Sequence, residues 1–265
     1  MDRDSKRETN AAGSTPTIKS VETAHRIIET LLEIGPATAT EVANHADLST
    51  GGTYKQLKTL QKGDFVVCRD RKYRLGYRFL DIGGRIRYQH PNSQIIKSKM
   101  RELAEETDET SIYTVLENTR TVTLFREMGT KGVSTRTRIG KRLYPHETAA
   151  GKVILSQLST REVERVLDAV GLPRVTENTI TDQETFLDEL AAVRERGYAY
   201  NLGESVDGLV AIAAPLIPGE TVLGACSVTG PYHRLKGDPI DEAVTESLLS
   251  FVNDLELNIA HSQTV

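Results

Sequence analysis

The sequence TGGTYKQLKTLQK, residues 50–62, predicts an α-helix with one packing side and one basic side. At about 100° per residue, the packing side collects Thr53, Leu57 and Leu60. The opposite side collects a glycine and the lysines: Gly51, Lys55, Lys58 and Lys62. Tyr54 lies on the flank of the basic side, and Ser49 is expected to cap the first turn. This helix is suited to rest on a core and to present cations outward.

Two further helices are expected before residue 50. Apolar residues recur at the spacing of one buried helix face, at Val21, Ala24, Ile27, Ile28, Leu31 and Leu32. Gly35-Pro36 ends this first helix, because proline lacks an amide hydrogen and disfavours helical geometry before it. Thr38 then begins a short second helix, and Glu41, three positions on, completes a capping box.

Two short β-prone runs follow the central helix. Phe65–Cys68 and Lys72–Leu75 are joined by Arg69-Asp70-Arg71, which predicts a hairpin with a basic tip. Three short helices followed by a basic hairpin predict a winged helix-turn-helix over residues 17–75. Residues 1–16 are polar with almost nothing to bury, and they predict a disordered tail.

Positive charge is concentrated around the central helix. Residues 50–88 contain 10 Lys and Arg against 3 Asp and Glu, although the formal net charge of the whole chain is −4. An α-helix fits the major groove of DNA, where base edges can be read, and a wing contacts phosphates. The residues expected in the groove are Thr50, Gly51, Tyr54, Lys55 and Lys58. Those expected on phosphates are Lys62, Arg69, Arg71, Lys72 and Arg74. The alternative is a protein–protein module whose lysines only add solubility.

Residues 76–90 predict a linker helix with Phe79, Leu80, Ile82 and Ile86 on an apolar side. Gly83-Gly84 interrupts it, and each glycine costs ~1 kcal/mol relative to alanine inside a helix. Two explanations are open: a kink or early helix end, or close approach of a partner helix. Pro91 marks the boundary to the second domain.

Residues 91–265 predict an α+β domain of antiparallel strands with helices packed beside them. The expected strands are 111–116, 121–126, 133–139, 209–217 and 221–229. The expected helices are 92–107, two that begin at the capping residues Ser159 and Thr181, and 241–259. Residues 149–151, at the start of another helix, offer backbone amides suited to a carboxylate.

Several classes of protein are disfavoured. No apolar run reaches the ~18–20 residues that span a membrane, so a cytoplasmic globular protein is expected. Cys68 and Cys226 are too few for a disulfide framework, and the histidines lack metal-ligand spacing. The segment 149–152 lacks the first glycine of a phosphate-binding loop, and no GxSxG occurs. No catalytic residue, metal or cofactor is expected.

A series of short motifs runs along nearly the whole chain. In the first half these are LSTGGTYK at 48–55, LQKG at 60–63 and YRLG at 73–76. In the second half they are PHETAAGK at 145–152, RGYA at 196–199, AIAAP at 211–215 and SVTGP at 227–231. In this order, the motifs resemble those of the IclR family of transcription regulators. The chain departs from the family at Thr53 and Gln56, where apolar residues are usual, and at Gly51-Gly52, where Ser-Thr is usual.

The resemblance implies a regulator whose linker helix pairs across a dimer, with two recognition helices on a pseudo-palindromic operator and a dimeric or tetrameric assembly. It also implies a GAF-like α/β domain that binds a small effector. By position, the effector contacts fall on Ala149, Gly151, Asn201, Ala211, Ser227 and Thr229. Asn201 stands where an acidic residue is common, and Ala211 where a cysteine can occur. The expected effector is a small organic acid, sugar acid or aromatic acid.

Overall fold

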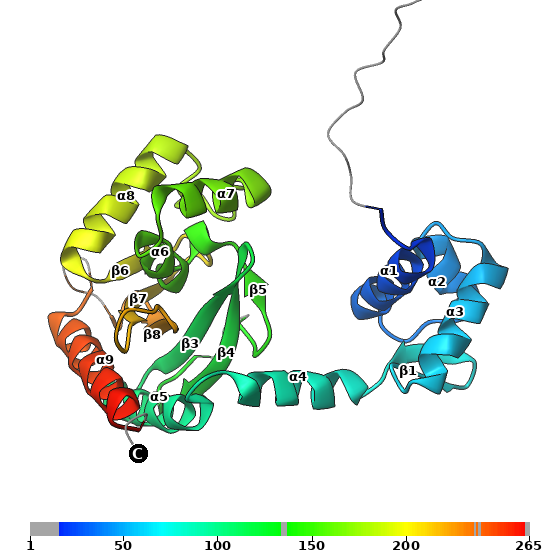
Figure 1. Cartoon of the computed structure of the whole chain (residues 1–265), viewed down its shortest axis with the longest axis horizontal. Coiled ribbons are helices and arrows are strands. Elements are labelled where there is room, and N and C mark those ends of the chain that lie inside the picture. The colour runs from blue at the N-terminus through cyan, green and yellow to red at the C-terminus, as the bar shows by residue number, and fades with distance from the viewer. Residues whose placement is uncertain (1–15, 134–136, 236, 238–239, 263–265) are drawn as a thin grey trace, which may run out of the picture. The chain divides into compact units, whose positions relative to one another are not determined.

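The computed structural model describes residues 16–133, 137–235, 237 and 240–262. The chain divides into two compact units, Met1–Arg85 and Ile86–Val265, and the division falls inside helix α4, Arg78–Gln89. Figure 1 shows the helices and strands of each unit. Of the predicted tail 1–16, only Pro16 belongs to the described residues.

Helices α1 (Lys19–Ile34), α2 (Ala39–His45) and α3 (Thr50–Lys62) are followed by a hairpin of β1 (Val66–Arg69) and β2 (Lys72–Leu75). Their side chains share one core, formed by Ile27, Leu31, Ala37, Val42, Leu57, Val66 and Tyr73. Ala37 and Tyr73 exchange two backbone hydrogen bonds, of 3.0 and 2.7 Å, which dock the hairpin onto the segment after α1. This unit has the helix order and β-wing of a winged helix-turn-helix.

Local capping signals in this unit are confirmed. The Glu41 amide donates to Thr38 Oγ1 at 3.3 Å, and the Thr38 amide donates to Glu41 Oε2 at 2.7 Å. Ser49 Oγ accepts from the Gly52 amide at 3.3 Å, so α3 begins where expected. The capping side chains occupy backbone donors that have no partner within the helix.

Two local expectations for this unit were wrong. Val21 and Leu32 are 63% and 58% exposed, so the buried face of α1 is narrower than predicted. Leu32 is turned about 100° from its buried neighbour Leu31. At the hairpin tip, Arg69 belongs to β1, and only Asp70 and Arg71 form the turn, both with positive φ (50° and 62°). A two-residue turn with this geometry matches the twist of the strands beside it.

Helix α4 continues through Gly83 and Gly84, so an early end does not explain the two glycines. A Cβ atom added at either glycine would meet nothing within 4 Å. Two of its large apolar side chains are exposed, Leu80 to 73% and Ile86 to 57%, whereas Phe79 and Ile82 are half-buried. Within the described residues, α4 thus presents an apolar, unobstructed side.

The second unit is built on an antiparallel sheet with strand order β5-β4-β3-β8-β7-β6. The strands are β3 (Thr110–Glu117), β4 (Arg120–Met128), β5 (Arg142–Leu143), β6 (Ala199–Leu202), β7 (Leu209–Leu216) and β8 (Gly224–Pro231). The helices are α5 (Ser93–Thr107), α6 (Ala149–Ser156), α7 (Thr160–Val170), α8 (Gln183–Arg196) and α9 (Glu242–Ser262), with a 3-10 turn at Pro145–Glu147. Figure 1 shows α5 and α9 on one face of the sheet and α6, α7 and α8 on the other.

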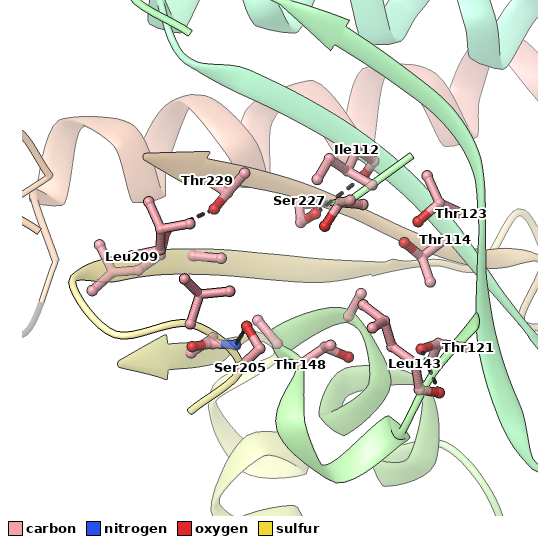
Figure 2. Close-up of a pocket in the computed structure, with 17 residues that line it drawn as sticks. Ile112, Thr114, Thr121, Thr123, Leu143, Thr148, Ser205, Leu209, Ser227 and Thr229 are labelled. Atoms are coloured by element: carbon pink, nitrogen blue, oxygen red, sulfur yellow. Dashed lines mark hydrogen bonds between the residues drawn. The ribbon is translucent and has the colours of Figure 1, made fainter. Parts of the chain in front are cut away.

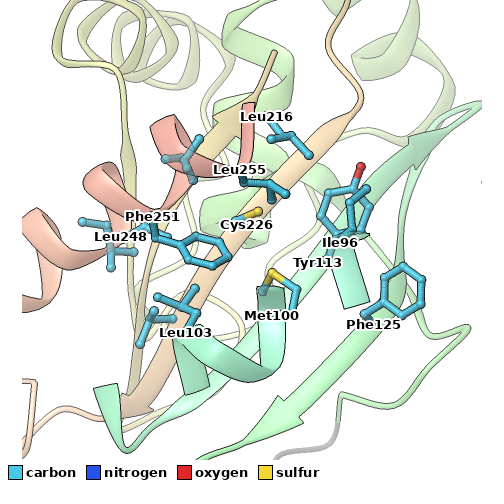
Figure 3. Close-up of a cluster of buried hydrophobic side chains, with 14 of the residues drawn as sticks. Ile96, Met100, Leu103, Tyr113, Phe125, Leu216, Cys226, Leu248, Phe251 and Leu255 are labelled. Carbon is cyan, nitrogen blue, oxygen red and sulfur yellow. The ribbon is translucent and has the colours of Figure 1, made fainter. Parts of the chain in front are cut away.

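The larger core lies between the sheet and the helices α5 and α9. Figure 3 shows Met100 and Leu103 of α5 meeting Leu248, Phe251 and Leu255 of α9 beside the sheet residues. A smaller core under α6 joins Val153 to Ala213 and Ala225 on the opposite face of the sheet. The antiparallel sheet is thus covered by helices on both faces.

The order of elements in this unit agrees with the sequence except at three places. Residues 137–139 and Val133 are not strand, residues 134–136 lie outside the described residues, and the strand is instead Arg142–Leu143. Strand β6, Ala199–Leu202, was missed. Helix α8 is capped by Asp182, which accepts from the Thr185 amide at 2.8 Å, rather than by Thr181. The capping box at Ser159 and Glu162 is confirmed.

The end of α4 is fixed to the sheet through His90. Its Nε2 lies 2.9 Å from the Tyr113 hydroxyl, and that hydroxyl donates to the Leu223 carbonyl at 2.9 Å. The Arg87 guanidinium lies 5.5 Å from the centre of the Phe125 ring. Because the Tyr113 proton is used on Leu223, the hydrogen bond to His90 requires a proton on Nε2.

His90 should make folding sensitive to acid. Burial lowers the pKa of His90 below its ordinary 6.5. His90 therefore binds a proton more readily in the unfolded chain than in the folded chain. Stability should therefore be intact above pH 6.5 and should decrease as the pH falls from 6.5 to the folded pKa. We expect His90→Gln to flatten the dependence of the denaturation midpoint on pH between 7.5 and 5.5. His25→Gln, at an exposed site on α1, is the control; an unchanged slope in His90→Gln would contradict this prediction.

Candidate functional site

The basic side of α3 is exposed, and its packing side is buried, as predicted. Thr53 and Leu57 are completely buried, whereas the Tyr54 ring is 49% exposed. Lys58 Nζ lies 5.5 Å from the centre of the Tyr54 ring and 6.0 Å from that of Tyr73, on β2. The exposed side of α3 and the hairpin are therefore neighbours on the surface of this unit.

The predicted groove and phosphate residues are mostly free to reach a partner. Exposed positions are Thr50, Gly51, Tyr54, Lys55, Lys58, Lys62, Arg69, Arg71 and Lys72. Arg74 differs, because it is half-buried, donates to the Leu75 carbonyl at 3.1 Å and stacks 5.3 Å from the Tyr77 ring centre. Arg74 is the phosphate candidate with the least freedom to move.

The two glycines that begin α3 have different surroundings. A Cβ at Gly52 would lie 2.8 Å from Ser49 Oγ, so glycine leaves room for the cap. A Cβ at Gly51 would meet nothing within 4 Å. Within the described residues, no steric contact requires glycine at position 51. The close approach of DNA to Gly51 remains a prediction.

A cavity in the second unit lies between the sheet and the beginning of α6 (Figure 2). Its volume is about 70 Å³, below the ~300–1,000 Å³ usual for drug-sized ligand sites. Five of the six predicted effector residues line it: Ala149, Asn201, Ala211, Ser227 and Thr229. The other lining residues are Ile112, Thr114, Thr121, Thr123, Thr137, Leu143, Thr148, Ala150, Ser205, Val206, Leu209 and Val210.

The cavity wall is rich in hydroxyl groups, and no charged side chain is among its lining residues. Several hydroxyls are already bonded to the backbone. Ser227 donates to the Ile112 carbonyl at 3.1 Å, Thr229 to Val210 at 3.0 Å and Thr121 to Leu143 at 3.3 Å. Each of these hydroxyls can still accept a hydrogen bond from a ligand, but its own proton is already donated to a backbone carbonyl.

The beginning of α6 faces the cavity. Thr148 caps the helix by accepting from the Gly151 amide at 3.0 Å. The amides of Ala149 and Ala150 occupy the first turn, where no acceptor exists within the helix. Amides in this position, together with the helix dipole, favour a negatively charged group.

Gly151, the sixth predicted effector residue, does not line the cavity. Its amide is occupied by Thr148, and a Cβ at this position would lie 2.1 Å from the Pro145 carbonyl oxygen. Glycine is required here because the backbone of α6 lies close to the 3-10 turn that precedes it. Its predicted contact with an effector does not fit this geometry.

Asn201 lines the cavity, but its amide is saturated by the protein. Nδ2 donates to the Glu147 carbonyl at 2.6 Å and to Ser205 Oγ at 2.9 Å. Oδ1 accepts from the amides of Gly203 and Glu204 at 3.1 and 3.0 Å. Asn201 therefore holds the loop after β6 in place, and its direct contact with an effector remains a prediction.

A buried ion network behind the cavity was missed by sequence reasoning. Lys152 of α6 is 2% exposed, and its Nζ lies 2.8 Å from Glu204 and 3.7 Å from Glu189. Glu189 also pairs with Arg196 at 2.9 Å. Burial raises the pKa of Glu204, and the Lys152 ammonium opposes that rise. The only sequence signal was a lysine in an otherwise apolar helix.

Other chemistries find no support in the described residues. Among them, no cluster of His, Cys, Asp and Glu could hold a metal ion. Cys226 is buried, and burial raises the pKa of its thiol, so it is not a reactive thiolate. No helix within the described ranges is both long and apolar enough to cross a membrane.

Comparisons with known proteins agree on one family. Residues 89–256 match the family model "Bacterial transcriptional regulator IclR C-terminal". The chain is 30% identical over 234 residues to the HTH-type transcriptional regulator KdgR of Escherichia coli, covering 86% of this chain and 88% of KdgR. It is 27% identical over 237 residues to the transcriptional repressor IclR of Escherichia coli, covering 87% and 86% of the two chains.

A solved structure also shares the fold. An IclR homologue from Microbacterium hydrocarbonoxydans, complexed with 4-hydroxybenzoate, aligns with a TM-score of 0.76 at 23% identity. The alignment covers 92% of this chain and 100% of the homologue.

Proposed function

Since the chain belongs to the IclR family of transcriptional regulators, we propose that it binds operator DNA through α3 and the β1–β2 hairpin. The observation that carries this proposal is the exposed basic side of α3 next to a hairpin that carries Arg69, Arg71 and Lys72. Tyr54, Lys55 and Lys58, with Thr50 and Gly51, would contact bases. The hairpin cations and Lys62 would contact phosphates, which position a protein without reading sequence.

The three parts of the chain have separate tasks in this proposal. Residues 17–75 bind DNA, 76–90 join two copies, and 91–265 bind an effector. The exposed apolar residues Leu80 and Ile86 support the second task, and none of the described residues fills the space beside Gly83 and Gly84. A second copy covering this side would present two α3 helices to a pseudo-palindromic operator.

The effector in this proposal is a small organic acid bound in the cavity beside α6. The first-turn amides of Ala149 and Ala150 suit a carboxylate, and no acidic side chain is among the lining residues to repel it. The complex of the Microbacterium homologue with 4-hydroxybenzoate makes this aromatic acid a rational first probe. To change operator affinity tenfold, the effector must distinguish two states by only ~1.4 kcal/mol.

The proposal is tested by footprinting the full chain on the DNA upstream of its own gene. The probes are benzoate, 4-hydroxybenzoate and short aliphatic carboxylic acids. We expect a protected pseudo-palindrome, steep loss of affinity with rising salt, and a changed affinity with at least one acid. Absence of binding to any duplex at low ionic strength would refute DNA binding and favour a protein–protein module.

A further inference from the structure

The loop between α7 and α8, residues 171–182, contributes no residue to the lining of the cavity. It is nevertheless firmly anchored to the domain. Leu172 and Ile180, near its two ends, pack against the apolar core shared by α6, α7 and α8. His146 of the 3-10 turn holds the loop from another side, because its Nε2 lies 3.0 Å from the Pro173 carbonyl oxygen. No residue of this loop was singled out from the sequence.

Two threonines of this loop bond to the backbone that follows β6. Thr179 is 5% exposed, and its hydroxyl donates to the Glu204 carbonyl at 2.8 Å. The same hydroxyl oxygen accepts from the amides of Val175 and Thr176, at 3.1 and 2.8 Å. The Thr176 hydroxyl donates to the Gly203 carbonyl at 2.8 Å. Because its proton and both lone pairs are in use, the Thr179 hydroxyl has one orientation, toward Glu204.

Glu204 is therefore fixed by three separate elements of the domain. Its carbonyl accepts from Thr179 of the α7–α8 loop. Its amide donates to Asn201 Oδ1 of β6 at 3.0 Å, and its carboxylate accepts from Lys152 Nζ of α6 at 2.8 Å. These bonds hold the backbone on both sides of one α-carbon, so the direction in which the chain leaves Glu204 is set by all three.

The chain after Glu204 forms one side of the cavity. Ser205 and Val206 both line it, and Figure 2 shows Ser205 on the side opposite Thr229 of β8. Most of the other lining residues belong to strands or to α6, whose backbones are held by regular hydrogen bonds. Because the cavity volume is only about 70 Å³, a small shift of the Ser205–Val206 side changes a large share of the space for a ligand.

We propose that Thr179 is a positioning residue of the effector site, which sets effector affinity through the backbone of Glu204 without touching the ligand. Loss of its hydroxyl leaves a carbonyl and two amides without their partner, and such groups favour a rearranged backbone that restores their bonds. The inference rests on the effector role proposed for the cavity, and it gives the α7–α8 loop a part in that role.

Two substitutions at this position test the proposal. Thr179→Val removes the hydroxyl and keeps nearly the same shape, whereas Thr179→Ser keeps the hydroxyl. Isothermal titration of the full chain uses benzoate, 4-hydroxybenzoate and short aliphatic carboxylic acids. We expect Thr179→Val to weaken binding of the acid that the unmodified chain binds best by about tenfold, the effect of lost and unsatisfied hydrogen bonds. Thr179→Ser should restore that affinity, and operator affinity without acid should be unchanged in both variants.

Thr245→Val is the control for a general loss of stability. It also removes a buried hydroxyl, which donates to the Asp241 carbonyl at 3.2 Å within α9. Both valine variants should melt at a lower temperature than the unmodified chain, but only Thr179→Val should lose acid affinity. Amide hydrogen exchange of residues 203–206 adds a readout that needs no ligand, and exchange should become faster in Thr179→Val alone.

The positioning role is overturned by any of three results. They are equal acid affinities of the two valine variants, loss of affinity in Thr179→Ser as large as in Thr179→Val, and unchanged exchange of residues 203–206 in Thr179→Val. Binding of none of the acids by the unmodified chain would reject the effector role of the cavity and the role of Thr179 with it. Operator binding, measured in the same preparations, shows whether the DNA-binding part of the proposed function stands in that case.

Discussion

Lys55→Ala is expected to reduce the ratio of operator affinity to random-DNA affinity by about tenfold, within the ~1–3 kcal/mol of one base contact. Lys55 lies on the exposed side of α3, one turn after Gly51, where no atom of the described residues would meet an added Cβ. A cation in this place can enter the major groove and contact base edges. Tyr54→Ala should change the preference among operator sequences in the same way.

Lys72→Ala is the matched comparison, because it removes the same charge from the hairpin. A phosphate contact carries no sequence information, so this variant should weaken operator and random DNA alike. It should also lower the slope of log affinity against log salt by about one. Lys72 is exposed at the first position of β2, beside the turn of Asp70 and Arg71, so its removal should leave the fold intact.

Fluorescence anisotropy with an operator duplex and a scrambled duplex, at several salt concentrations, measures both quantities. Equal losses on the two duplexes for Lys55→Ala, Tyr54→Ala and Lys72→Ala would remove the distinction between groove and phosphate residues. Circular dichroism of each variant establishes that the loss comes from the interface. The packing side of α3 offers a contrasting variant, Leu57→Ala, which should destabilise the unit by ~2–5 kcal/mol because Leu57 is completely buried.

Local signals carried the sequence-based prediction of the fold. The capping pairs Thr38–Glu41 and Ser159–Glu162 place helix starts correctly, because a cap is decided by residues three apart. The buried and exposed faces of α3 were also predicted correctly, because they depend on the spacing of residues within one helix. Family resemblance added what local signals lack, and it placed Ser227 and Thr229 in the cavity, on β8 in the middle of the sheet.

What the sequence did not reveal depends on contacts between distant residues. Strand β6 is only four residues long and gains its hydrogen bonds from β7, so Ala199–Leu202 has little signal of its own. A β-bulge beside Thr114 exists only in the pairing of β3 with β4. Asn201 was expected to contact a ligand, but four hydrogen bonds to the loop and the 3-10 turn occupy its amide. The Glu147 carbonyl that Asn201 contacts is 54 positions away, although its three other partners lie two to four residues on.

The buried ion network around Lys152 was also not predicted from the sequence. Substitution of Lys152 has the largest effect on stability that we expect. Lys152→Met should lower the free energy of unfolding by ~3–5 kcal/mol, the usual cost of removing one partner of a buried ion pair. Glu204, 7% exposed, would then keep a buried charge without the cation that lies 2.8 Å away. Glu189 still has Arg196 at 2.9 Å, so the loss falls mainly on Glu204.

Acid should partly rescue Lys152→Met. Burial already raises the pKa of Glu204, and loss of the lysine raises it further because the lysine favoured the charged form. Below the folded pKa the carboxyl is protonated and carries no charge to desolvate. The deficit relative to the unmodified chain should therefore be full well above the folded pKa and should shrink as the pH falls through it. Urea denaturation at several pH values measures this dependence.

The double variant Lys152→Met/Glu204→Leu distinguishes a lost ion pair from lost packing. Because it removes both charges, its stability should return to within ~1 kcal/mol of the unmodified chain. Effector binding should not return with it, since Glu204 precedes Ser205 and Val206, which line the cavity, and Lys152 fixes that loop against α6. Equal stability losses in the single and double variants would show that Lys152 acts through its packed side chain alone, and the network would then have no part in holding the cavity wall.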